Sequence, residues 1–149
     1  MKKINSLFNS LEGAYAPNTI RSYRSDFEHY ATWCRKYQYD PLDTHEDKFA
    51  DYILEMGESL TVATIQRRVA SLSSIFNLTK STNPTKEPVV ILTFKKLRRK
   101  FGKPQKQATP LTYDILIKLK NICSDDIVGL RNKLLLQLGY ETMRRRSEI

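Results

Sequence analysis

Apolar side chains recur at steps of three and four residues along most of the chain, which is the spacing of one face of an α-helix. The clearest predicted helix covers residues 17–37 and begins at Pro17, since proline suits the first helical turn. Its inward positions are Ile20, Tyr23, Phe27, Tyr30, Ala31, Cys34 and Tyr37. Aromatic residues at this spacing are more often core than base-stacking platforms. They and Trp33 are therefore predicted to pack.

The same spacing predicts four more helices before residue 103, over residues 2–12, 45–57, 61–78 and 88–102. Gly13 and Gly57 end the first and third helices of the chain. Thr44 is predicted to cap the third helix, because the acidic residues Glu46 and Asp47 follow in its first turn. The apolar residues 89–92 leave a short strand open as an alternative at the start of the fifth helix.

Residues 103–110 contain two prolines, no large apolar side chain and no periodic pattern, so they are predicted to be an extended interdomain linker. Beyond them, Thr112 is expected to cap a helix that ends near Ile122, and Ser124 with Asp125 to start another that ends near residue 140. This last helix is apolar nearly all round at residues 134–136, which predicts a buried helix. The residues after the linker are too few for an independent catalytic domain, so the chain is expected to be part of a longer protein.

Composition agrees with an all-α fold. The chain is 40% hydrophobic, and its five glycines and six prolines argue against disorder and against a turn-rich β fold. No apolar run approaches the roughly 20 residues that span a bilayer, and the first residues lack the apolar region of a secretory signal. Cys34 and Cys123 lie far apart inside helical patterns, which predicts two reduced core thiols and a cytoplasmic protein.

Positive charge is concentrated in the second half of the chain. Residues 1–81 carry ten basic and ten acidic side chains, whereas residues 82–149 carry fifteen and six. Eight basic residues and one acid lie between residues 86 and 106, which indicates a polyanionic partner. This stretch lacks the aromatic face of an interfacial membrane anchor, so nucleic acid is favoured. Neither histidine has partners at metal-ligand spacing, and no metal or other cofactor is expected.

Two polar clusters are candidates for phosphate contact. The first is the polar face of the 61–78 helix, where small hydroxyls and two arginines suit a phosphate backbone or base edges, although a solvated face has about equal weight. Its members are Thr64, Arg67, Arg68, Ser71 and Ser74. The second is the run Arg144, Arg145 and Arg146, which follows an apolar helix. Arginine offers a planar fork that fits a phosphate, but a solvated basic chain end is the plainer interpretation.

Taken together, residues from about 15 to 149 resemble the N-terminal part of a tyrosine recombinase of the phage-integrase family. The segments that carry the resemblance are Asn18-Thr-Ile-Arg-Ser-Tyr23 with Tyr30-Ala-Thr-Trp33, Ala63-Thr-Ile-Gln-Arg-Arg-Val-Ala-Ser-Leu72, Leu97-Arg-Arg-Lys with Lys106-Gln-Ala-Thr-Pro-Leu111, and Arg131-Asn-Lys-Leu-Leu-Leu-Gln-Leu-Gly-Tyr140 with Thr142-Met-Arg-Arg-Arg-Ser-Glu-Ile149. Their order and spacing make the set more specific than any one of them.

The resemblance implies a SAM-like core-binding bundle of four to five helices over residues 1–102. The linker 103–110 and the beginning of a catalytic domain, residues 111–149, would follow. It also implies a metal-free site-specific recombinase that cleaves and rejoins DNA through a 3′-phosphotyrosine. Members assemble as tetramers on double-stranded DNA with inverted half-sites. The full-length protein is thus expected to be an enzyme, whereas this chain alone is expected to bind DNA without cleaving it.

The family motif Thr-x-x-Arg-x-Ser/Ala-Glu-Leu/Ile selects Arg145 and Glu148 as catalytic residues. Arg145 would neutralise the scissile phosphate. Glu148 would orient the guanidinium of Arg145 from the same helical face. Arg144 stands where the family has a small or apolar residue, so which arginine points inward stays open. The remaining catalytic groups, including the tyrosine nucleophile, are expected beyond Ile149.

For DNA contact, the resemblance selects the second and fourth helices as the pair that crosses the major groove. The matching positions are Thr19, Arg21, Ser22, Thr64, Arg67 and Arg68. Phosphate contacts are expected from Lys95, Lys96, Arg98, Arg99, Lys103 and Lys106. Two rival functions stay open, namely a non-catalytic helical DNA-binding regulator and a helical adaptor for an acidic protein or RNA.

Overall fold

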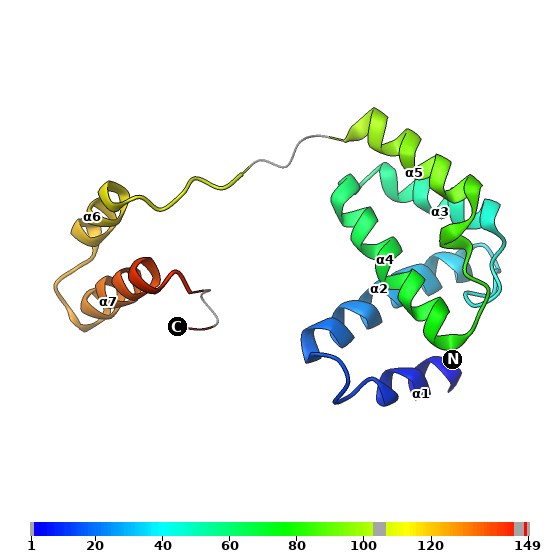
Figure 1. Cartoon of the computed structure of the whole chain (residues 1–149), viewed down its shortest axis with the longest axis horizontal. Coiled ribbons are helices and arrows are strands. Elements are labelled where there is room, and N and C mark those ends of the chain that lie inside the picture. The colour runs from blue at the N-terminus through cyan, green and yellow to red at the C-terminus, as the bar shows by residue number, and fades with distance from the viewer. Residues whose placement is uncertain (1, 103–106, 145–147, 149) are drawn as a thin grey trace. The chain divides into compact units, whose positions relative to one another are not determined.

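The computed structural model describes residues 2–102, 107–144 and 148, and all regular secondary structure in them is helical (Figure 1). The elements are α1 (Lys2–Ser10), α2 (Pro17–Lys36), α3 (Glu46–Gly57), α4 (Val62–Thr79), the 3₁₀ turn η1 (Pro84–Lys86), α5 (Pro88–Phe101), α6 (Tyr113–Ile122) and α7 (Ile127–Thr142). The all-α prediction is confirmed, and residues 89–92 belong to helix α5 and not to a strand.

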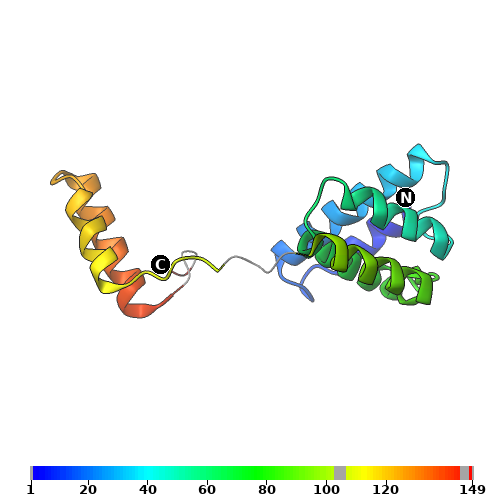
Figure 2. The same cartoon turned by 90° about the horizontal axis from the view of Figure 1, so that it is seen from above.

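The chain divides into two compact units, residues 1–104 and residues 105–149. We call them unit 1 and unit 2. Unit 1 contains α1 to α5, and unit 2 contains α6 and α7, which lie side by side (Figures 1 and 2). In the described part of the chain, no helix is long and apolar enough to cross a bilayer.

An aromatic cluster forms the centre of unit 1. Tyr30 of α2, with Phe49 and Tyr52 of α3, is fully buried, and Phe76 of α4 is 1% exposed. The ring centroid of Tyr30 lies 4.9 Å from that of Tyr52 and 5.4 Å from that of Phe49. These residues come from the apolar stripes of three helices, so the periodic pattern correctly predicted them. Trp33 is also buried, as expected. Tyr37, which the same pattern placed inward, is 41% exposed.

The predicted cap of the third helix is wrong by one residue. His45 is the N-cap of α3, and its Nδ1 accepts from the backbone N–H of Asp47 at 3.5 Å. Thr44 is buried instead, and its hydroxyl donates to the carbonyl oxygen of Asp40 at 2.6 Å. The Thr44 hydroxyl is therefore engaged in the turn that begins at Asp40 and does not cap the helix. A similar shift occurs in unit 2, where Asp126 caps α7 by accepting from the N–H of Gly129 at 2.7 Å.

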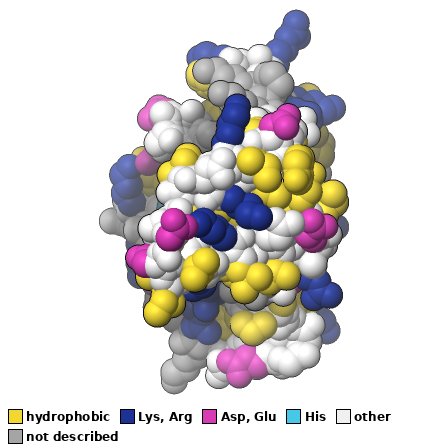
Figure 3. All heavy atoms as spheres, turned by 90° about the vertical axis from the view of Figure 1, so that its left-hand side faces the viewer, with side chains coloured by type: hydrophobic (Ala, Val, Ile, Leu, Met, Phe, Trp, Pro, Cys, Tyr) yellow, Lys and Arg dark blue, Asp and Glu magenta, His cyan; other side chains and the backbone are white. Residues whose placement is uncertain are grey.

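Helix α7 is not the buried helix that its sequence predicts. Leu134 is 59% exposed and Ile127 is 86% exposed. Among the described side chains of unit 2, only that of Leu116 is fully buried, because two helices cover only the faces that they turn to each other. Figure 3, viewed from the side on which Figure 1 draws α6 and α7, shows many hydrophobic side chains at the surface. Both cysteines are free thiols, but only Cys34 is buried, whereas Cys123 is half-buried.

Candidate nucleic-acid interface

Helices α2 and α4 pack against each other, and a buried carboxylate joins them. Asp26 of α2 is 2% exposed. Arg67 of α4 donates to it through both terminal nitrogens, Nη1 to Oδ2 at 2.6 Å and Nη2 to Oδ1 at 2.9 Å. Paired hydrogen bonds of this kind hold the guanidinium in one plane. Sequence reasoning missed Asp26, although it falls on the inward arc of α2 beside Phe27 and Tyr30, where a charged residue signals a buried ion pair.

Arg68 approaches the same carboxylate from the interior. Its Nε lies 3.7 Å from Oδ1 of Asp26, and its side chain is only 18% exposed. Its Nε and Nη1 are buried and have no hydrogen-bond partner among the described residues. Ser71 is buried as well, and its hydroxyl donates to the carbonyl of Arg67 at 3.1 Å. The polar face predicted for this helix therefore includes Arg67 but neither Arg68 nor Ser71.

A histidine and a tyrosine extend this polar network toward α3. Nδ1 of His29 lies 2.9 Å from the hydroxyl of Tyr52. Burial, and then the positive charge of Arg68, lower the pKa of His29 below its ordinary value of 6.5. Burial raises the pKa of Tyr52, so that hydroxyl stays neutral.

The lowered pKa of His29 predicts that the folded protein loses stability in acid. Unfolded chains bind a proton at His29 near pH 6.5, whereas the folded chain binds it only at lower pH. The contribution of His29 to the unfolding free energy is thus complete above pH 6.5 and is lost as pH falls from there through the folded pKa. We expect His29→Asn to flatten this part of the profile, which melting temperatures between pH 7.5 and 5 would measure. Parallel profiles for the two proteins would contradict the assignment.

The remaining predicted contacts on α2 and α4 are accessible to different degrees. Arg21 and Ser22 are exposed near the start of α2, and Nη1 of Arg21 donates to Oδ1 of Asn18 at 3.2 Å. Thr19 and Thr64 are half-buried. The hydroxyl of Thr64 lies 2.9 Å from that of Thr61, the N-cap of α4, so it helps to begin the helix.

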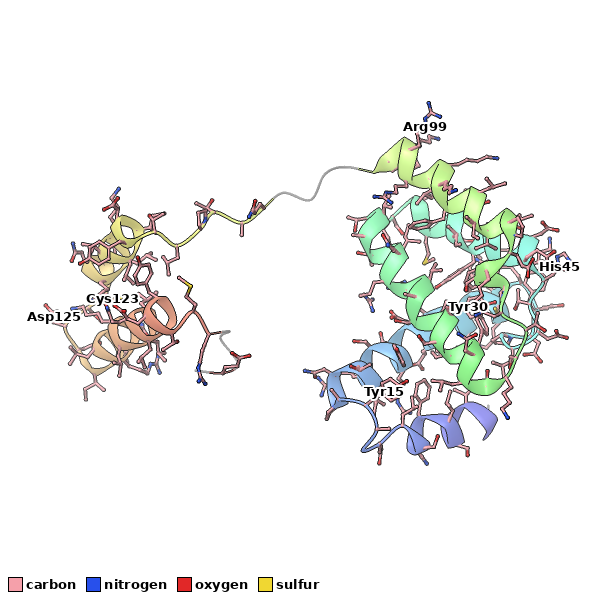
Figure 4. The ribbon with its side chains drawn as sticks, viewed as in Figure 1. Tyr15, Tyr30, His45, Arg99, Cys123 and Asp125 are labelled. Carbon is pink, nitrogen blue, oxygen red and sulfur yellow. The ribbon has the colours of Figure 1, made fainter. Side chains whose placement is uncertain are left out.

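Helix α5 carries the densest positive charge in unit 1. Its exposed basic residues are Lys95, Lys96, Arg98, Arg99 and Lys100. None of them forms an ion pair with a described carboxylate. Lys95 and Arg98 line a groove of about 470 Å³ between α4 and α5, with Val69 and Phe94 among its apolar walls. Arg99 projects from the end of α5 (Figure 4).

Acidic side chains gather on a different helix. Asp47 and Asp51 are exposed on α3, and Glu58 is exposed at its C-cap. The fourth member of the predicted acidic stripe, Glu55, instead accepts hydrogen bonds from Nζ of Lys36 at 2.9 Å and Nε1 of Trp33 at 2.8 Å. These bonds lower the pKa of Glu55.

Three residues selected by the sequence, Lys103, Lys106 and Arg145, lie outside the described residues. Glu148 is described and exposed, and so is Arg144. Helix α7 ends at Thr142, and Met143 adopts a left-handed conformation with φ of 49°. Among the described residues, no group of three His, Cys, Asp or Glu side chains is arranged to hold a metal ion.

Comparison with known proteins bears on the helices just described. The profile of the family described as "Phage integrase, N-terminal SAM-like domain" matches residues 5–82, which is more than half of the chain. The chain belongs to the phage-integrase family of tyrosine recombinases. The matched residues contain α2, α3 and α4 with the Asp26–Arg67 pair, so the recombinase resemblance seen in the sequence is confirmed.

A curated relative extends the similarity beyond the profile. The chain is 27% identical over 143 residues to a protein of Selenomonas ruminantium named "Integrase/recombinase xerD homolog". The alignment covers 93% of this chain and 42% of the relative. This tyrosine recombinase chain therefore spans about two-fifths of the length of that relative.

Proposed function

We propose that unit 1 binds double-stranded DNA, with α2 and α4 facing the major groove and α5 contacting phosphates. The observation that carries this proposal is the charge on α5. Five exposed basic side chains there lack an ion-pair partner among the described residues, although exposed carboxylates are present on α3, which packs against α5. Unpaired charges that lie close together repel each other, and a polyanion relieves that repulsion.

We extend the proposal to the longer protein of which this chain would form a part. That protein would be a site-specific recombinase that cleaves and rejoins DNA through a 3′-phosphotyrosine, working as a tetramer on inverted half-sites. Residues 1–102 would be its core-binding domain, residues 103–110 its linker, and residues 111–149 the start of its catalytic domain. Arg145 would neutralise the scissile phosphate, and Glu148 would orient that arginine. Lys103 and Lys106 would contact phosphates where the linker passes the duplex.

Binding measurements on the 149-residue chain test the first step. Fluorescence anisotropy with a labelled duplex, a single strand of the same sequence and an RNA of the same length, each at 50 and 200 mM salt, would compare the three polyanions. We expect the duplex to bind most tightly and its affinity to fall steeply with salt. Equal binding of all three nucleic acids would favour the adaptor function instead.

Arg99 provides a focused test of the phosphate contacts. Arg99→Gln removes one exposed charge from α5, so we expect weaker binding to every duplex, and a plot of log K against log salt that is shallower by about 0.9. Lys48→Gln is the matched control, because Lys48 lies on α3 beside Asp51 and should leave that slope unchanged. An unchanged slope for Arg99→Gln would remove it from the interface.

A further inference from the structure

Arg67 is held along one edge of its guanidinium and open along another. A guanidinium carries five N–H donors, and it can make paired hydrogen bonds through the two terminal nitrogens or through Nε and one terminal nitrogen. Asp26 occupies the first edge. The Nε–H and the outer N–H groups have no partner among the described residues, and the side chain is 52% exposed. A planar fork of donors is therefore available on the surface of α4.

The support beneath this fork is rigid. The Asp26 carboxylate is 2% exposed, and Arg68 lies on its inner side at 3.7 Å. If Asp26 turned away, Arg68 would be left inside the bundle without its counter-charge, so the carboxylate is confined to its present position. Arg67 thus loses its rotamer freedom when the protein folds. Binding a ligand therefore costs Arg67 less side-chain conformational entropy.

The charge balance indicates which part of DNA this fork fits. Phosphate contacts gain affinity from net positive charge and the release of counterions, whereas base contacts depend on the direction of each hydrogen bond. Asp26 offsets part of the positive charge of Arg67 and Arg68, and its paired hydrogen bonds fix the direction of the Arg67 guanidinium. This arrangement is a poor phosphate contact and a good base contact. Guanine presents two acceptors, O6 and N7, in the major groove, and they match a paired arginine edge.

We propose that Arg67 reads a guanine in each half-site through O6 and N7, and that Asp26 is the residue that positions it. The inference rests on the proposed function, since it requires α4 to face the major groove. To the proposed function it adds the base that is read, the two base atoms that accept the hydrogen bonds, and separate roles for Arg67 and Arg68. Arg67 determines sequence preference, Arg68 supports Asp26 from inside, and the basic residues of α5 set the overall affinity.

Arg67→Lys is the decisive variant, because lysine keeps the charge and loses the fork. The probe is a pool of duplexes with randomised positions, selected on the 149-residue wild-type chain and on the variant. We expect the wild-type selection to contain a strongly preferred guanine whose preference falls by roughly 5- to 150-fold in the variant, with the salt dependence unchanged. Arg99→Gln should do the reverse, with a shallower salt dependence and the same preferred sequence. A uniform loss of affinity and a shallower slope for Arg67→Lys would show a phosphate contact and overturn the proposal.

Asp26→Asn tests the positioning role. We expect it to weaken the guanine preference at the same position, although the net charge of the protein rises by one. Equal affinity changes for all duplexes would make Asp26 structural only, against the proposal. If fluorescence of Trp33 shows that Asp26→Asn does not fold, Asp26→Glu retains the charge with a displaced carboxylate and should give a partial loss of preference. Failure of the wild-type chain to bind any duplex would sink the proposed function itself, whereas duplex binding with an unaltered preference in Arg67→Lys would sink only this inference.

Discussion

Asp26→Asn is expected to lower the unfolding free energy of unit 1 by about 3–5 kcal/mol. The substitution preserves shape but removes the negative charge that lies between Arg67 and Arg68. Arg67 is half-exposed and can turn to water, but Arg68 is 18% exposed and would keep its charge in the interior without a counter-charge. An unpaired buried charge is among the few single changes that reach this magnitude. Urea unfolding followed by fluorescence reports on unit 1 alone, because the only tryptophan is Trp33.

Asp51→Asn is the matched control for this measurement. Asp51 also lies near a cation, with Nζ of Lys48 at 3.8 Å from Oδ2, but its side chain is 60% exposed. Surface pairs of this kind contribute about 0–1 kcal/mol, so the control should barely change stability. Similar small losses in both variants would mean that the Asp26 site is hydrated, and that Arg68 does not depend on the carboxylate.

Phe49→Ala is expected to destabilise unit 1 by a comparable amount, about 3–5 kcal/mol. Phe49 is fully buried, and its ring meets those of Tyr30 and Phe76 edge-on, at centroid distances of 5.4 and 6.1 Å. Removing the ring takes away its burial and leaves a cavity, which these large neighbours can fill only in part. The same urea titration measures the loss, and a lower melting temperature should accompany it.

Leu54→Ala on the same helix separates packing from helix propensity. Leu54 is 51% exposed, and leucine and alanine are both good helix formers, so a change within about 0.5 kcal/mol is expected. If Phe49→Ala were equally mild, the aromatic cluster would have to close around the missing ring. Near-ultraviolet circular dichroism would detect that rearrangement as a loss of aromatic signal without loss of helix.

Much of unit 1 follows from residue spacing alone. The stripe of Ile65, Leu72 and Phe76 on α4 is buried as the three- and four-residue steps indicate. The starts of α2 and α4, at Pro17 and after Thr61, lie where local chemistry places them. These features depend on residues within one or two turns of each other, so the chain near each position is sufficient to predict them.

The sequence predicted the members of the candidate interface but not their different environments. Arg67 and Arg68 are neighbours of the same chemical type, and periodicity assigned both to one polar face. The fold gives them different environments, because both approach Asp26, which lies 41 residues before Arg67 in the chain. Arg67 reaches the carboxylate from the surface, and Arg68 reaches it from the interior. Thr44 shows the same limit on a smaller scale, since the turn at Asp40 takes its hydroxyl away from the helix.

The helical class, the apolar stripes, the concentration of positive charge after residue 81 and the recombinase resemblance can all be recognised without coordinates. Each of these is a property of composition or of nearby residues. Three features emerge only when the helices pack: α7 exposes its leucines within unit 2, Glu55 bonds to Trp33 and Lys36, and Arg67 presents a fixed donor edge. Burial and ion pairing depend on which helices meet, and helical spacing specifies the face of each helix but not its partner.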